Sequence, residues 1–126
     1  MLRKGLIAIA LFLVVLTGCG MKNHTFSGES ENWLAELEVR QTGDFEEQDF
    51  ILRYKGEDAE SVDTFTYHID TNAGDSSGSR ITLADNGVYE DKGGSCRGCA
   101  FVRENSEIIV TVEWNGKTES FSLYNE

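Results

Sequence analysis

Residues 108–123 read IIVTVEWNGKTESFSL, and this stretch decides the fold class of the chain. Every second residue from Ile108 to Trp114 is apolar, which is the period of a strand with one buried face. Asn115-Gly116 follows, and these residue types tolerate the positive φ angles of a two-residue hairpin turn. We therefore predict an antiparallel hairpin that pairs Trp114 with Lys117, Val112 with Glu119, Val110 with Phe121 and Ile108 with Leu123.

The same period of two recurs upstream of this hairpin. It predicts strands over Trp33–Val39, Phe50–Tyr54, Thr64–Asp70 and Arg80–Leu83, with shorter candidates at Val88-Tyr89 and Ala100–Arg103. Helix signals are weak, and only Glu57–Val62 could make a short turn. About seven or eight strands separated by Gly, Asn and Asp turns predict an all-β fold, an antiparallel immunoglobulin-like β-sandwich. A small closed barrel is the alternative.

The composition limits the classes of function. The chain has 126 residues and a formal charge of −11, from 22 acidic and 11 basic residues. This length allows one small domain and excludes a two-domain enzyme. The acidic excess argues against a nucleic-acid partner, because a phosphate backbone is bound by Lys and Arg.

The N-terminus has the pattern of an export signal. Arg3 and Lys4 precede Leu6–Leu16, an unbroken apolar run of eleven residues. A helix of this length spans about 17 Å, whereas the bilayer hydrocarbon is roughly 30 Å thick. The run is therefore too short to cross a membrane, and it has the length of a signal-peptide core.

Leu16-Thr17-Gly18-Cys19 comes next and resembles the lipobox of bacterial lipoproteins. The resemblance implies that Cys19 becomes the mature N-terminus, with a diacylglyceryl group on sulfur and fatty acyl (palmitate) chains. We expect a lipoprotein signal peptide over 1–18, a tether over 19–25 and a β-sandwich domain over 26–126, anchored to the cell membrane on its extracytoplasmic side. The mature chain would have 108 residues, with 22 acidic and 9 basic ones giving a formal charge of −13.

Cys96-Arg97-Gly98-Cys99 is the clearest chemical pattern of the mature domain. Zinc needs four ligands, and only His24 and His68 could join the two cysteines. Thiol–disulfide exchange favours a first cysteine at a helix N-terminus, whereas glycines precede this pair and strand-like residues follow it. We favour a structural disulfide between Cys96 and Cys99, formed on the oxidising side of the membrane. Redox activity is the alternative.

Two other patterns match a chemical function in part. Gly74-Asp75-Ser76-Ser77-Gly78 fits the G-x-S-x-G nucleophile elbow, but the chain is short for such a hydrolase and the segment looks like a loop. Carboxylates crowd at 44–49, 57–63 and 70–75, yet none of these segments has the spacing of a calcium loop. We expect no catalytic residues, no cofactor and no metal site.

Residues 26–33, FSGESENW, resemble the opening of small lipoproteins of Bacillus-type bacteria, in which a similar stretch follows the lipidated cysteine and a short spacer. The resemblance implies location and an all-strand domain, and it supplies no catalytic residues. From the residues themselves, Phe26 and Trp33 would anchor the first strands. Gly28 would allow a bulge or a tight bend between them.

These patterns together predict a lipid-anchored extracytoplasmic lipoprotein whose domain binds or contacts an envelope component and is not an enzyme. Its expected partners are the membrane, through lipid on Cys19, and an envelope protein or polymer. Two alternatives stay open. One is a thiol–disulfide protein that uses Cys96 and Cys99, and the other is a calcium-stabilised adhesive module.

Overall fold

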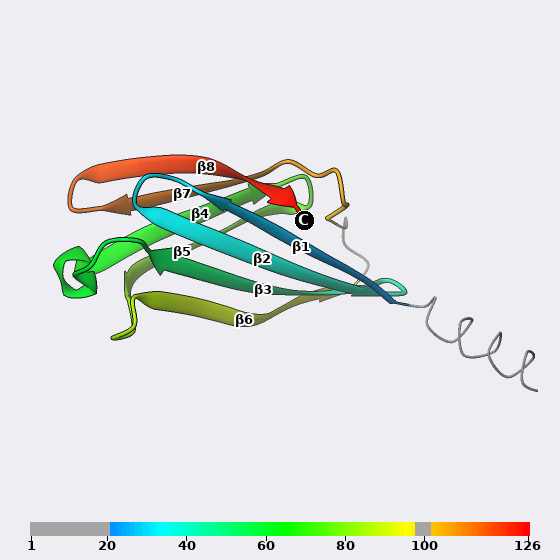
Figure 1. Ribbon diagram of the computed structural model, residues 1–126. Helices are drawn as coiled ribbons and strands as arrows, with labels where there is room; N and C mark the ends of the chain where they lie inside the picture. The colour runs from blue at the N-terminus through cyan, green and yellow to red at the C-terminus, as the bar shows by residue number, and fades with distance from the viewer. Residues whose placement is uncertain (1–20, 98–101) are drawn as a thin grey trace, which may run out of the picture.

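Eight antiparallel strands form the sheet in Figure 1, a computed structural model that describes residues 21–97 and 102–126. The strands are β1 (Met21–Glu29), β2 (Trp33–Thr42), β3 (Phe45–Tyr54), β4 (Thr64–Thr71), β5 (Gly74–Thr82), β6 (Val88–Arg97), β7 (Ile108–Trp114) and β8 (Lys117–Asn125). A short 3-10 helix, η2 (Ala59–Val62), lies between β3 and β4. The predicted all-β class and the helical turn within 57–62 are both confirmed.

The strands pair in the order β5-β4-β7-β8-β1-β2-β3-β6 within one sheet. Its two halves join where β8 pairs with β1, at Phe26–Asn125 and Ser27–Tyr124. On the far side, the Tyr67 hydroxyl of β4 donates a hydrogen bond of 3.1 Å to Asp91 of the edge strand β6. The sheet is therefore nearly closed. This resembles a small barrel, and the immunoglobulin-like sandwich in particular is not confirmed.

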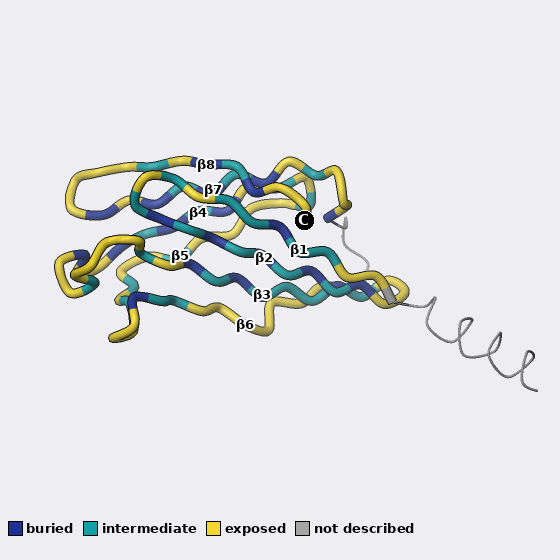
Figure 2. Tube along the Cα trace, viewed as in Figure 1, coloured by how far each residue is buried: buried dark blue, intermediate teal, exposed yellow. Residues whose placement is uncertain are grey.

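Buried residues alternate mainly with partly buried ones along β2, β4 and β7, as the colours of Figure 2 show. All four pairs predicted for the β7–β8 hairpin occur in its register. The inward residues expected in β2 and β4 are buried, namely Trp33, Ala35, Leu37, Val39, Phe65, Tyr67 and Ile69. Four aromatic rings fill one end of the core, because Trp33 lies 5.3 to 5.4 Å from the rings of Tyr54, Phe65 and Trp114.

Three strands are longer than their sequence pattern predicted. β1 begins at Met21, so residues 21–25 of the expected tether pair with residues 38–42 of β2. β5 includes the Gly74–Gly78 stretch that looked like a loop, and β6 continues through Gly93 and Gly94 to Arg97. β5 and β6 are edge strands, exposed along most of their length. Such strands need no apolar alternation, so the periodicity misses them.

The FSGESENW stretch forms the joint between β1, β2 and β8. Gly28 does not create a bend. Its missing side chain lets β8 pack closely, because a Cβ at this position would lie 2.1 Å from the carbonyl oxygen of Ser122. The Ser30 hydroxyl and the Asn32 side-chain amide each donate to the Glu119 carboxylate at 2.5 Å, and the Asn32 N–H donates at 3.0 Å. Burial alone would raise the pKa of Glu119, but these hydrogen bonds outweigh it and lower the pKa below its usual value.

Candidate functional site

One end of the sheet, which we call the base, consists of the start of β1, the β2–β3 turn and the end of β6. Pairing aligns Met21 with Thr42, Thr42 with Phe45, and Phe45 with Arg97, so these strand ends form one row. Figure 1 shows this end projecting beyond the ends of β4 and β7. The base therefore gathers the first described residue of the chain and the strand that carries Cys96.

A buried polar cluster lies one row inside the base. The Glu46 carboxylate, only 3% exposed, accepts hydrogen bonds from the Gln41 side chain at 3.2 Å and from the Gln48 side chain at 2.5 Å. It also accepts the Val102 N–H at 3.1 Å, and the Gln41 side chain donates to the Val102 carbonyl. The cluster therefore fastens the chain after β6 onto β2 and β3. We did not predict it, although extending the inward alternation of β2 and β3 places all three polar side chains inside.

Cys96 lies in β6 directly opposite Glu46 and is exposed. Cys19 and Cys99 lie outside the described residues, so the lipidation and the Cys96–Cys99 bridge stay predictions. Both flanks of the segment 98–101 are held on β3, since Arg97 pairs with Phe45 and Val102 bonds to Glu46. Cys96 lies in a strand. A reactive thiolate is favoured instead at the start of a helix.

The carboxylates of residues 44–49 do not converge on one point. Asp44 lies in the β2–β3 turn and pairs with Arg97 at 3.1 Å, while Glu46 points inward. Glu47 and Asp49 are bound by Arg40 outside the core. Within residues 21–97 and 102–126, no group of three or more His, Cys, Asp or Glu side chains is placed to hold a metal ion.

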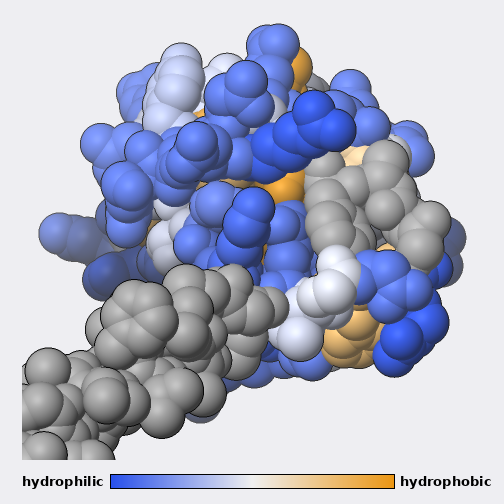
Figure 3. Space-filling model, turned by 90° about the vertical axis from the view of Figure 1, so that its right-hand side faces the viewer, coloured by the Kyte–Doolittle hydropathy of each residue, from blue (hydrophilic) through white to orange (hydrophobic). Residues whose placement is uncertain are grey.

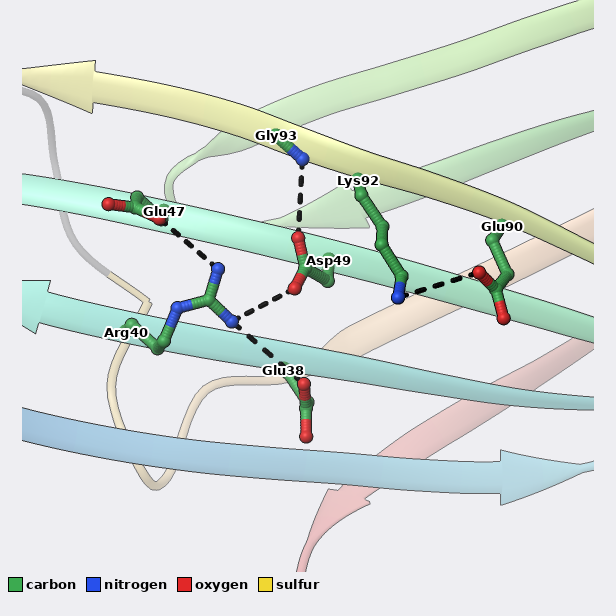
Figure 4. Close-up of polar contacts among 7 residues, drawn as sticks. All are labelled: Glu38, Arg40, Glu47, Asp49, Glu90, Lys92 and Gly93. Atoms are coloured by element: carbon green, nitrogen blue, oxygen red, sulfur yellow. Dashed lines mark hydrogen bonds and ion pairs between the residues drawn. The ribbon is translucent and has the colours of Figure 1, made fainter.

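Arg40 organises the outer face of β2 and β3, as Figure 4 shows. Its guanidinium lies 2.9 Å from Asp49, 3.2 Å from Glu47 and 3.9 Å from Glu38. Glu38 and Asp49 face each other across the two strands, so their like charges would repel without this cation. The hydrogen bond from Arg40, followed by that from the Gly93 N–H, lowers the pKa of Asp49. We interpret this network as structural.

The second carboxylate group, at 57–63, lies at the end of the barrel opposite the base. Glu57, Asp58, Glu60 and Asp63 line an open hollow of about 530 Å³ together with Asp85. Arg53 and Lys55 line it as well, and Lys55 also pairs with Glu29 at 3.4 Å. Five carboxylates against two cations make this end strongly acidic.

The Gly74–Gly78 stretch does not form a nucleophile elbow. It lies within the exposed edge strand β5, whereas the elbow requires a sharp turn from a strand into a helix. Ser77 faces His68 in the register of β4 and β5, and His68 Nε2 lies 3.5 Å from Asp75. The His68 side chain is 45% exposed, so this group lies in solvent rather than in an enclosed site.

Comparison of the chain with protein-family models, with curated proteins and with solved structures finds no match. Among the described residues, no helix has the length and hydropathy needed to cross a membrane.

Proposed function

We propose that this protein is a lipid-anchored extracytoplasmic lipoprotein whose barrel is a non-enzymatic domain for binding or contacting the cell envelope. One observation supports the anchor beyond the lipobox itself. The first strand begins at Met21, two residues after Cys19. Cleavage before Cys19 would therefore remove none of the eight strands, and the mature chain would keep the whole described sheet.

The non-enzymatic role is supported by where the polar groups lie. Glu46 is the most deeply buried carboxylate of the described residues, and it accepts hydrogen bonds from the side chains of Gln41 and Gln48 and from the Val102 N–H, which hold the fold together. The carboxylates bound by Arg40 form a network on the outer face. Ser77 and Asp75 are exposed, and the His68 side chain beside them is 45% exposed. A domain of this kind offers surfaces to an envelope protein or polymer rather than an enclosed reaction site.

The Cys96–Cys99 bridge fits the same proposal as a structural element. A loop this short contributes about 2 kcal/mol in the chain-entropy model, at the low end of the usual range. Glu46 already holds Val102 on the far side of the loop, so the bridge would reinforce a connection that the polar cluster makes.

Membrane fractionation of cells that produce the full chain tests the anchor. Cys19→Ala should abolish incorporation of labelled palmitate, and the chain should then be either released from the membrane fraction or left uncleaved with residues 1–18 attached. Cys96→Ala is the matched control, since it also removes one thiol but should leave both membrane retention and labelling unchanged. Palmitate labelling that persists in Cys19→Ala would contradict the proposal.

A further inference from the structure

The distance between the proposed lipid and the barrel is very short. Gly20 alone separates Cys19 from Met21, and two residue steps reach at most about 7 Å. Met21 itself is fixed in the sheet by its pairing with Thr42. The tether that the sequence suggested, up to Phe26, would have reached about 25 Å. A barrel held this closely cannot move away from the bilayer surface.

Charge distinguishes a barrel that stands on its base from one that lies on its side. β1 carries Lys22 and His24 but no carboxylate before Glu29. In the row at the base, Arg97 is exposed and pairs with an exposed Asp44. This makes the base nearly neutral in a mature chain whose formal charge is −13, from 9 basic and 22 acidic residues.

Two other surfaces are more acidic than the base. The outer face of β2 and β3 presents Glu36, Glu38, Glu47 and Asp49 around Arg40, and the end opposite the base carries the five carboxylates of the hollow. Anionic lipids repel carboxylates within about one Debye length of the bilayer. Lying on the β2–β3 face, or inverting, would bring these carboxylates against the lipid.

The chemistry of the base suits headgroups rather than hydrocarbon. Figure 3 looks onto this end of the molecule, and its described residues there are mainly hydrophilic. Polar side chains of this kind can contact the polar layer of a bilayer without entering its apolar core.

We infer that the base rests against the headgroup layer of the bilayer, so that the barrel stands on the membrane and holds its acidic end outward. The inference rests on the proposed lipid anchor at Cys19. β2 runs from Thr42 at the base to Trp33 at the other end, and its ten residues span roughly 30 Å. The acidic hollow would therefore be presented about 30 Å from the lipid.

Paramagnetic relaxation in a bilayer tests this orientation. The full chain is purified from membranes into nanodiscs that contain a lipid with a gadolinium chelate on its headgroup. The Thr42 and Gly43 amides at the base should relax roughly tenfold or more faster than those of Gly87 and Gly116 at the other end, given the 30 Å separation. Equal enhancement at both ends, or stronger enhancement at Gly87 and Gly116, would overturn the inference.

A matched variant isolates the effect of the short connection. Ten Gly and Ser residues inserted after Gly20 keep the lipid and the barrel but add a chain with a typical reach of about 17 Å. The ratio of relaxation enhancement between the two ends should fall by at least half, and a ratio that stays the same would contradict the role of the short connection.

The intact mass of the same sample separates the two proposals. An unmodified Cys19 overturns the anchor and the orientation together, whereas a lipidated chain without the contrast overturns the orientation alone.

Discussion

Gly28→Ala is the substitution that most directly probes the joint between the two halves of the barrel. The new Cβ would lie 2.1 Å from the Ser122 carbonyl oxygen and 3.1 Å from Leu123 Cδ2. The oxygen belongs to the backbone of β8, so β8 itself must move by about 1 Å to reach even a tight contact of 3.0 Å. That movement strains the strand pair that joins β8 to β1. Overpacking of this kind destabilises a protein by about 1–3 kcal/mol.

Urea unfolding of Gly28→Ala measures this loss, and Gly94→Ala is the control. Gly94 also lies in a strand, but its added Cβ would make an ordinary contact of 3.5 Å with Gln48. Alanine there should leave stability unchanged or raise it by up to about 1 kcal/mol, because it restricts the unfolded chain. We expect a lower midpoint and an unchanged m-value for Gly28→Ala. A Gly28→Ala protein as stable as the parent would refute the close approach of β8.

Two further predictions concern polar contacts, and a third concerns the proposed disulfide. Glu119→Gln should lower the free energy of unfolding by about 1–2 kcal/mol at pH 7. Because folding lowers the pKa of Glu119, the parent is more stable than the variant by this full amount above pH 4.5, and the difference shrinks as the pH falls through the folded pKa. Urea unfolding of both proteins at pH 7 and pH 3 would measure this change. Tyr67→Phe removes the hydrogen bond to Asp91 across the open side of the barrel and should cost about 1 kcal/mol, with equal stability counting against that contact. The Cys96–Cys99 bridge should have a reduction potential below about −300 mV, whereas a value near −200 mV would favour exchange chemistry.

The β7–β8 hairpin could be predicted residue by residue, while the edges of the sheet could not. Asn115-Gly116 fixes the register of the hairpin, and burial on one face makes its alternation visible. β5 is exposed along most of its length and carries mostly small polar residues, so no apolar alternation in the sequence marks its pairing with β4. The same reason explains why the first five residues of β1 resembled a tether. A nearly closed sheet and a sandwich have the same alternation of buried and solvent-facing residues along their strands, and the pairing of β8 with β1 is what distinguishes them here.

The base could be predicted only in part. The sequence singled out Cys96 for its chemistry but did not predict that it lies in a strand, and the start of the mature chain at Cys19 stays a prediction. The buried cluster around Glu46 was missed because a carboxylate near a turn usually faces solvent. Its partner Val102 lies 56 residues away, and no local pattern carries that contact. The contact of Ser30 and Asn32 with Glu119 was missed for the same reason.

The intact mass of the mature chain extracted from membranes tests the central claim most directly. We predict a chain of 108 residues that begins at Cys19 and carries a diacylglyceryl group on that residue. A membrane-extracted chain that retains residues 1–18, or one that begins at Cys19 without lipid, would contradict the claim.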